Sequence, residues 1–211
     1  MDVWARLYAI VDAGVAARAG WTPPDLARAY LDGGARLLQL RAPGIDAASQ
    51  LDWCQAIVAL ATPCGAHLIV NDRCDLALMG GAAGVHLGQD DLPVPAARRL
   101  LGPTAVIGLS THDAEQVATA VRLPVSYLAV GPVYDTRTKD TGYGAVGLDA
   151  VRRTTSAAGD RPVVAIGGIT LDTAPDVIAA GARCVAVISD LLVGGDPGRR
   201  VREYLDVLGE P

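Results

Sequence analysis

The segment from Gly131 to Gly144 holds hydroxyl and cationic side chains close together between glycines. It follows a short apolar run, Tyr127–Val130, which is typical of a buried strand. The side chains at its centre are Thr136, Arg137, Thr138 and Lys139. Hydroxyls, cations and glycine backbone N–H groups are donors that proteins use to hold phosphate. We therefore expect this segment to be a loop that binds an anionic, phosphorylated ligand.

Carboxylates follow two other apolar runs. Asp72 comes just after His67–Val70, and Asp90 and Asp91 come after Gly84–Leu87. If the two runs are neighbouring parallel strands, Asp72 lies close to Asp90 or Asp91. Two carboxylates then form a typical Mg²⁺ site when phosphate oxygens complete the coordination shell. The alternative is that these aspartates cap the helices that follow, and the residues alone leave both interpretations open.

The run Arg36–Leu40 leads into a further polar pair, Gln39 and Arg41. Side chains alternate along a strand, so these two point the same way. An arginine at the end of a strand suits a bidentate contact with phosphate. Pairing of Arg41 with a carboxylate inside the fold is the alternative, and we favour the ligand contact.

Ser110, Thr111 and His112 follow another apolar run. Ser110 or Thr111 has the right chemistry to cap the next helix. His112 is either an acid–base group or a residue at the start of that helix. The other two histidines, His67 and His86, lie within or at the start of strands, and we expect both to be structural.

Backbone donors are expected after the last two apolar runs. Gly167 and Gly168 follow Val163–Ile166, and Ser189 begins a helical segment after Cys184–Ile188. Glycines after one strand and a helix start after the next form a common phosphate site in barrels. Such a site needs no positively charged surface.

These groups must be positioned by a regular alternation of strands and helices. The expected strands are Arg6–Val11, Arg36–Leu40, His67–Val70, Gly84–Leu87, Ala105–Gly108, Tyr127–Val130, Val163–Ile166 and Cys184–Ile188. The expected helices are Pro24–Leu31, Ala47–Ala61, Cys74–Met79, Val94–Leu101, Ala114–Val121, Leu148–Ala158, Thr173–Ala180 and Arg199–Leu208. This alternation predicts one α/β domain over residues 1–211, a (β/α)₈ TIM barrel. A doubly wound open sheet is the alternative.

Composition limits the function classes. Half of the 211 residues are apolar (51%), which excludes a disordered chain, and the net charge of −5 argues against a nucleic-acid surface. Arg6 and Asp12 interrupt the apolar stretch near the N-terminus, so we expect neither a signal segment nor a membrane span there. Four cysteines without CxxC spacing indicate reduced thiols and a cytoplasmic protein: Cys54, Cys64, Cys74 and Cys184.

Taken together, the motifs resemble those of the thiamine-phosphate synthase family. The segments that carry the resemblance are 8–12 (YAIVD), 39–41 (QLR), 71–73 (NDR), 84–92 (GVHLGQDDL), 108–112 (GLSTH), 131–139 (GPVYDTRTK) and 165–169 (AIGGI). They run in order from about residue 6 to residue 192. The segments 84–91 and 136–139 are the most specific among them.

The resemblance implies a (β/α)₈ barrel that joins hydroxymethylpyrimidine diphosphate to hydroxyethylthiazole phosphate. Thiamine phosphate and diphosphate are its products, formed by a dissociative, Mg²⁺-assisted substitution. The implied diphosphate-side contacts are Gln39, Arg41, Asn71, Ser110 and Lys139. Arg41, Ser110 and Lys139 are the implied catalytic residues. The implied thiazole-phosphate contacts are Thr136, Thr138, Gly168 and Ser189. Asp72 and Asp91 would hold Mg²⁺, with Asp90 a weaker candidate.

Two departures from the family pattern stand out. Pro43 occupies a position where the family usually has a lysine, and residues 140–144 differ from the common continuation of the loop. A thiazole tautomerase of the same superfamily is therefore the second choice, and a non-catalytic phosphate-binding regulatory barrel is the third. Asp72 and Asp91, together with Thr138 and Lys139, favour the synthase. The partners expected are small phosphorylated substrates, and the sequence leaves the choice between monomer and homo-oligomer open.

Overall fold

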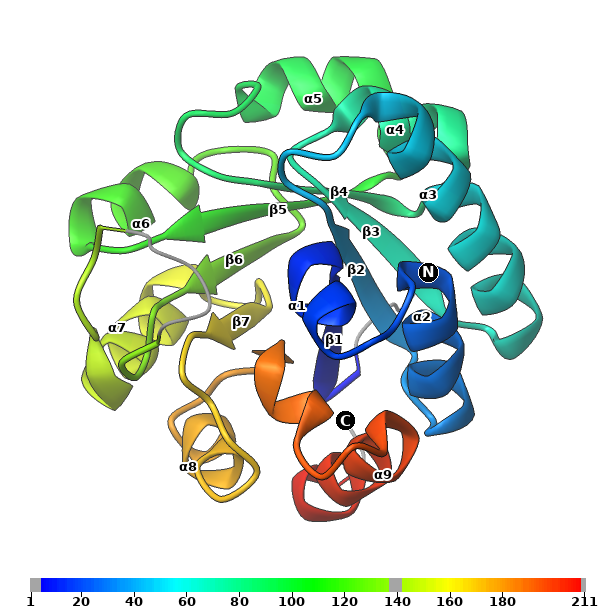
Figure 1. Ribbon diagram of the computed structural model, residues 1–211. Helices are drawn as coiled ribbons and strands as arrows, with labels where there is room; N and C mark the ends of the chain where they lie inside the picture. Colours follow the sequence, from blue (N-terminus) through cyan, green and yellow to red (C-terminus); the bar gives the residue numbers. More distant parts are fainter. Residues whose placement is uncertain (1–4, 137–141, 210–211) are drawn as a thin grey trace.

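In the computed structural model of the protein, which describes residues 5–136 and 142–209, eight parallel strands close into a barrel surrounded by helices (Figure 1). The strands pair in chain order, and the last pairs with the first. Their bounds are β1 Leu7–Asp12, β2 Leu37–Arg41, β3 His67–Asn71, β4 Gly84–Leu87, β5 Val106–Thr111, β6 Tyr127–Val130, β7 Val163–Ile166 and β8 Cys184–Val187. The predicted (β/α)₈ barrel is confirmed, and the open-sheet alternative is wrong.

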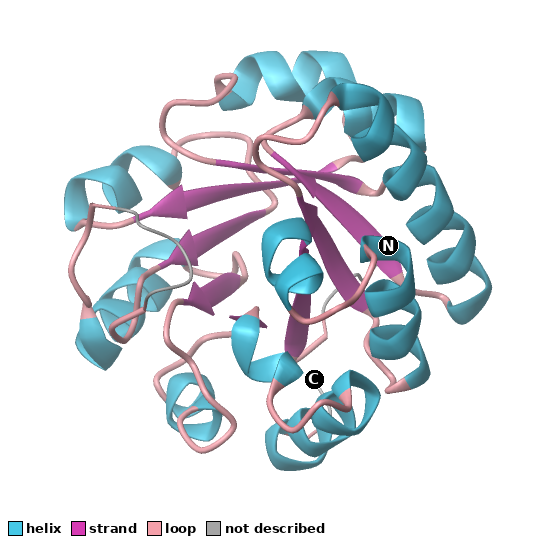
Figure 2. Ribbon diagram, viewed as in Figure 1, coloured by secondary structure: helices cyan, strands magenta, loops and turns pink. Residues whose placement is uncertain are grey.

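The helices lie outside the strands, except that α1 covers the centre of the view in Figure 1 (Figure 2). Their bounds are α1 Ala13–Arg18, α2 Pro23–Asp32, α3 Ala47–Ala61, α4 Cys74–Gly80, α5 Val94–Leu101, α6 Ala114–Ala120, α7 Gly147–Ala158, α8 Ala174–Ala179 and α9 Pro197–Leu208. Two short 3₁₀ helices, η1 Thr62–Cys64 and η2 Ser189–Leu192, complete the described elements. All eight predicted helices are present, and their ends shift by at most two residues.

Each strand is buried on both faces, which divides the apolar residues into two cores. Leu7, Ala9 and Val11 of β1 pack outward, in the core between the barrel and its helices. Tyr8 and Ile10 point the other way, into a separate core inside the barrel. The two-residue period of a strand produces this division. It also explains why the strands are continuous apolar runs in the sequence.

The main differences from the sequence-based expectations concern the ends of elements. Helix α1 was not predicted, because its six residues are too few to show helical periodicity. Strand β5 runs on to Thr111, so Ser110 and Thr111 are strand residues and the capping role considered for them is wrong. Asp113 caps α6 instead, and its Oδ1 accepts a hydrogen bond from the Gln116 N–H at 2.8 Å.

The cysteines carry no disulfide. Cys54, Cys74 and Cys184 are buried, whereas Cys64 is exposed. Burial raises the pKa of the Cys54 thiol to about 11. Among the described residues, no helix combines the length and the apolar character that a membrane crossing requires.

Glycine is required where strands approach each other most closely. A Cβ atom on Gly84 of β4 would lie 1.8 Å from the Val106 carbonyl oxygen of β5. That oxygen belongs to the paired strand and has no room to move, because Gly84 and Val106 face each other in the sheet register. The close approach therefore depends on the missing side chain at Gly84.

We predict that Gly84→Ala lowers the free energy of unfolding by about 3 kcal/mol, because the added methyl group forces β4 and β5 apart. Urea unfolding followed by circular dichroism measures this change. Gly144→Ala is the control: nothing lies within 4 Å of a Cβ there, and we expect a change below about 0.5 kcal/mol. Equal stability of the two variants would show that the strands do not depend on Gly84.

Candidate functional site

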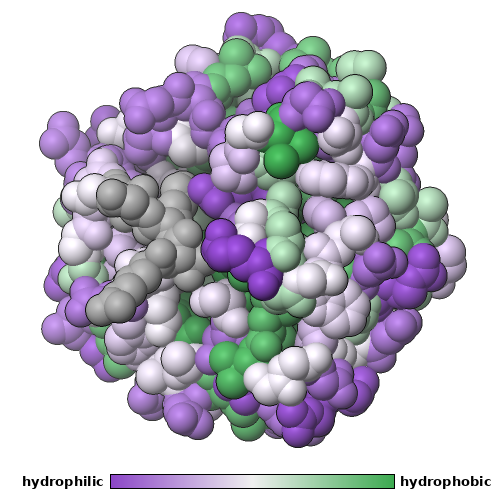
Figure 3. Space-filling view, in the orientation of Figure 1, coloured by the Kyte–Doolittle hydropathy of each residue, from purple (hydrophilic) through white to green (hydrophobic). Residues whose placement is uncertain are grey.

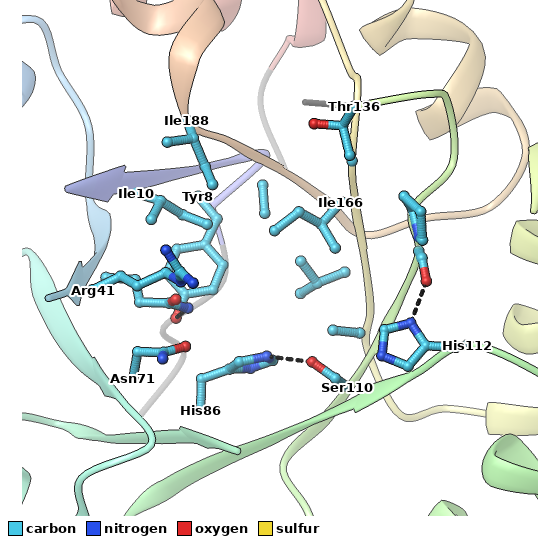
Figure 4. Close-up of a pocket in the computed structure, with 17 residues that line it drawn as sticks. Tyr8, Ile10, Arg41, Asn71, His86, Ser110, His112, Thr136, Ile166 and Ile188 are labelled. Atoms are coloured by element: carbon cyan, nitrogen blue, oxygen red, sulfur yellow. Dashed lines mark hydrogen bonds between the residues drawn. The ribbon is translucent and has the colours of Figure 1, made fainter. Parts of the chain in front are cut away.

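The carboxyl ends of the strands surround a pocket at the mouth of the barrel (Figure 4). Side chains from β2, β3, β4 and β5 line it: Gln39, Arg41, Asn71, His86 and Ser110. Thr136 lies across the pocket from Asn71 and His86 in Figure 4. Hydrophilic residues gather near the centre of the face shown in Figure 3. The structure thus brings together the polar residues that sequence analysis placed at separate strand ends.

Arg41 pairs with a carboxylate, which the sequence left as an alternative, and its predicted ligand contact stays a prediction. It lines the pocket, and its Nη1 also donates a hydrogen bond to Asp12 Oδ2. The two side chains are largely buried, with 16% and 6% of their surfaces exposed. Within the described part of the chain, the Arg41 Nε is buried and has no hydrogen-bond partner. The pair therefore fixes the guanidinium at the mouth.

Asp12 was not among the predicted site residues. Its Oδ1 accepts from the Val15 N–H at 2.9 Å, so one carboxylate caps α1 and holds Arg41. The register pairs Asp12 directly with Arg41 on the neighbouring strands β1 and β2. The signal in the sequence was an aspartate at the end of a strand, immediately before a short helix. Only the strand pairing shows that its partner is Arg41.

A second pocket, beside Asn71 and Ser110, is lined by the three aspartates Asp72, Asp90 and Asp91. Asp91 Oδ2 accepts from the Gly88 N–H at 2.6 Å, which fixes the turn after β4. The capping alternative is wrong for both candidate ligands, because Arg73 precedes α4 and Pro93 precedes α5 without a side-chain cap. In the described ranges, no group of three or more histidine, cysteine or acidic side chains is able to hold a metal.

Asp72 has an unusual backbone conformation, with a φ of 64°. This left-handed conformation is uncommon outside glycine, although aspartate tolerates it better than most residues. Strained conformations of this kind are concentrated at functional sites. The strain at Asp72 supports a role for this turn in the site rather than in the fold.

A third pocket lies beside the first, at the ends of β7 and β8. Gly167, Gly168, Ser189 and Thr136 line it. Gly168 has a φ of 64°, and a Cβ there would lie 2.5 Å from the Asp135 carbonyl oxygen, so only glycine fits under the loop. Thr136 lines both this pocket and the first one. The predicted phosphate-binding residues are therefore adjacent.

The loop that carries Thr136 is attached to the end of β7. The Val133 N–H donates to the Ile166 carbonyl at 2.9 Å, and the Tyr134 N–H donates to that of Gly167 at 3.0 Å. These two bonds extend the sheet beyond β6 and bring the loop over Gly168. Arg137, Thr138 and Lys139 lie outside the described residues, so their predicted contacts stay predictions.

Helix η2, which begins at Ser189, is held by an ion pair on its outer side. Asp190 Oδ2 accepts from Arg200 Nη2 at 2.8 Å and from the Tyr204 hydroxyl at 2.7 Å. Burial is the main cause that raises the pKa of Tyr204, so its hydroxyl remains a donor. The positive charge of Arg200 therefore balances the negative charge of the Asp190 carboxylate, next to Ser189.

His112 is fixed at the edge of the first pocket. Its Nδ1 lies 2.6 Å from the Gly131 carbonyl oxygen and so carries the proton of that hydrogen bond. The ring stacks on Tyr143, with ring centres 4.0 Å apart and an angle of 12° between the planes. Its backbone N–H donates to Gln116 Oε1 at 2.8 Å. These contacts leave Nε2 as the ring atom available to the pocket.

A row of buried and partly buried hydrogen bonds crosses the interior of the barrel and ends at the pocket. Gln39 Nε2 donates to the Tyr8 hydroxyl at 2.9 Å, and the Tyr8 and Tyr127 hydroxyls are 3.3 Å apart. The Tyr127 hydroxyl lies 2.8 Å from His86 Nδ1, and His86 Nε2 lies 2.9 Å from Ser110 Oγ. Sequence analysis gave His86 a structural role and did not single out the tyrosines. Strand alternation, which points Tyr8 into the barrel, was the available signal.

Comparisons with known proteins agree with this geometry. The family model described as thiamine monophosphate synthase matches residues 7–191. A thiamine-phosphate synthase of Acidothermus cellulolyticus is 45% identical over 201 residues, which are 95% of this chain and 93% of that protein. The thiamine biosynthesis bifunctional protein ThiM/ThiE of Symbiobacterium thermophilum is 48% identical over 187 residues, 89% of this chain and 39% of that longer protein.

A solved structure is also similar. The thiamine phosphate pyrophosphorylase from Pyrococcus furiosus superimposes with a TM-score of 0.87 at 29% sequence identity. The match covers 96% of this chain and 95% of that one. The similarity therefore extends over nearly the whole barrel, including its mouth.

We predict that Asp12→Asn lowers the free energy of unfolding by about 1.5–3 kcal/mol, because the buried Arg41 guanidinium loses its charged partner. Asp149→Asn is the matched control. It breaks the exposed pair with Arg152, where 57% and 79% of the two side chains are accessible, and we expect less than about 0.5 kcal/mol. Urea unfolding measures both, and an equal loss in the two variants would contradict the role of Asp12.

Proposed function

The chain belongs to the thiamine monophosphate synthase family, and from this membership we infer that it is a thiamine-phosphate synthase, a transferase of thiamine biosynthesis. The substrates proposed are hydroxymethylpyrimidine diphosphate and hydroxyethylthiazole phosphate. The bond between the pyrimidine methylene carbon and the diphosphate oxygen breaks, and diphosphate leaves with the electron pair. The thiazole nitrogen then forms the new bond to that carbon. The products are thiamine phosphate and diphosphate.

One observation carries this proposal: two sets of anion-binding groups lie on adjoining pockets. Arg41 and Ser110 line the first pocket, Gly168 and Ser189 line the third pocket beside it, and Thr136 lines both of these. A reaction between two phosphorylated molecules needs this arrangement, because each anion must be held while the reacting atoms meet between them. Arg41 and Ser110 would hold the diphosphate, and the glycine turn with Ser189 would hold the thiazole phosphate.

The residues between the two sets suit a cationic intermediate. Ile10, Ile166 and Ile188 line the first pocket together with Ala129 and Val164. These side chains offer no nucleophile, and they exclude water from the place where the pyrimidine carbocation would form. Gln39 lies at the polar edge of this apolar lining, where it is able to orient the pyrimidine ring.

Mg²⁺ fits the pocket that holds Asp72 and Asp91. Magnesium is commonly bound through one or two carboxylates together with substrate phosphates and water, and it does not need a full set of protein ligands. Carboxylate oxygens lie there beside Asn71 and Ser110, on the side proposed for the diphosphate. When bound, the ion supplies positive charge that stabilises the departing diphosphate. Asp91 keeps its Oδ2 on the Gly88 N–H and is thereby oriented toward this side.

Pro43 gives Lys139 particular importance. Arg41 is the one cation among the described residues that line the first pocket. Arg73 does not replace the missing lysine, because it forms a two-bond pair with Asp75 at 2.8 and 2.6 Å. The further charge on the diphosphate would then be met by Lys139 or Arg137, which lie outside the described residues. A cytoplasmic location also stays a prediction.

The synthase is favoured over the two alternatives by the names of the relatives that cover the chain. We expect the purified protein with both substrates and Mg²⁺ to form thiamine phosphate and diphosphate, and we expect EDTA to stop the reaction. Liquid chromatography with mass detection measures the products. Aromatisation of a thiazole phosphate without any thiamine phosphate would instead identify a tautomerase. Absence of both activities would favour the regulatory barrel.

Lys139→Ala should lower kcat about ten- to a hundredfold, because a charged hydrogen bond to the leaving diphosphate is lost. Arg152→Ala is the control, since Arg152 is an exposed cation whose partner is Asp149 on the same helix, α7. We expect this control to keep its activity and both variants to keep their unfolding midpoints. Unchanged turnover in Lys139→Ala would refute the role given to the loop.

A further inference from the structure

The buried row of hydrogen bonds has a direction. Gln39 donates to the Tyr8 hydroxyl oxygen, so the Tyr8 proton is available for Tyr127. The Tyr127 proton is then available for His86 Nδ1, at 2.8 Å. A neutral imidazole that accepts at Nδ1 carries its proton on Nε2. His86 therefore donates from Nε2 to Ser110 Oγ, and the Ser110 proton remains for a ligand.

The opposite direction requires Gln39 to turn its amide. With the Gln39 oxygen against Tyr8, the Tyr8 hydroxyl donates to Gln39, and every other hydrogen bond of the row reverses its donor and acceptor. Ser110 must then donate to His86. Ser110 would then present only lone pairs to the pocket, and these repel an anion. In the part of the chain that the structure describes, the Tyr8 hydroxyl has two hydrogen-bond partners, Gln39 and Tyr127. A mixed order would leave either the Tyr8 proton without an acceptor among them or the Tyr8 and Tyr127 oxygens facing each other without a proton between them.

Burial keeps the row rigid. Tyr8 and Tyr127 are each 1% exposed, and their rings meet edge to face with centres 6.3 Å apart. A Cβ on Gly108 would lie 2.0 Å from the Tyr127 Cζ, so this glycine makes room for the phenol ring. Desolvation raises the pKa of both tyrosines, so each hydroxyl keeps its single proton. Because each hydroxyl has one proton, the direction of one hydrogen bond fixes the direction of the next one in the row.

We propose that Tyr8 and Tyr127 are positioning residues that fix the proton order between the two ends of the row, Gln39 and Ser110. In this order Gln39 presents its carbonyl oxygen, which fits an N–H donor on the pyrimidine. Ser110 presents its O–H, which fits a diphosphate oxygen. Both ends line the mouth. The assignment of ligands to the ends rests on the proposed function, whereas the proton order rests on the hydrogen bonds alone.

The test is the tautomer of His86, measured by ¹⁵N NMR of the histidine side chains. The chain has three histidines, so a His86→Gln sample identifies the signals of His86. In the free wild-type protein we expect a proton on Nε2 and none on Nδ1. Gln39→Glu, studied above about pH 9 because burial raises the pKa of a carboxyl group, places an acceptor against Tyr8 and reverses the order. His86 should then carry its proton on Nδ1.

A double variant separates the row from a direct effect of the new charge. Tyr8→Phe combined with Gln39→Glu keeps the carboxylate but removes the hydroxyl next to it, so the switch to Nδ1 should disappear. Tyr8→Phe alone should leave His86 as a mixture of tautomers. Tyr30→Phe is the matched control, because Tyr30 is buried outside the barrel interior and should leave the spectrum unchanged.

The proposal is overturned by a proton on Nδ1 in the wild type, or by the same His86 tautomer in wild type and Gln39→Glu. A switch that persists in the double variant would also overturn it. If Gln39→Glu does not fold, Tyr8→Phe decides alone, and an unchanged single tautomer there is the contradicting result. None of these spectra involves turnover. A failure of thiamine phosphate synthesis is therefore distinguishable from a failure of the proposed proton order.

Discussion

Burial of the strands on both faces is the constraint that decides where polar groups lie in this protein. All six residues of β1 are buried, with one set packed toward the helices and the other toward the barrel interior. Burial of a polar group without a hydrogen-bond partner at such a position would cost about 2–7 kcal/mol of folding free energy, depending on the environment. Polar side chains therefore collect at the carboxyl ends of the strands. Barrel closure brings eight such ends to one mouth, so residues far apart in sequence form one site.

The polar side chains of the described residues that line the barrel interior are mostly paired, with Arg41 Nε an exception. Asp12 neutralises Arg41 and caps α1 with its second oxygen. Gln39, Tyr8 and Tyr127 satisfy one another and continue to His86. Because each group is held by the next, the ends that we propose as ligand contacts do not have to be ordered by the substrate itself. Such preorganisation lowers the cost of binding and of charge development during the reaction.

The pattern of apolar and polar residues indicates the strand ends but not the connections among them. Alternation predicted that Gln39 and Arg41 share a side, and the glycines after β7 predicted a phosphate turn; both lie at the mouth. The pattern could not show that His86 meets Ser110, 24 residues away, or that Tyr8 meets Tyr127, 119 residues away. These contacts depend on the closure of the barrel and on the register of its strands. The local periodicity of the sequence indicates neither. The capping roles considered for the aspartates and for Ser110 failed because the boundaries of helices and strands decide them.

The central claim is that one mouth holds two anions on adjoining sides. A crystal structure of the protein with Mg²⁺, diphosphate and hydroxyethylthiazole phosphate tests it most directly. We expect diphosphate in contact with Arg41 and Ser110, and the thiazole phosphate at Gly168 and Ser189. Diphosphate without contact to Arg41 or Ser110, or both anions bound on the same side, would contradict this arrangement.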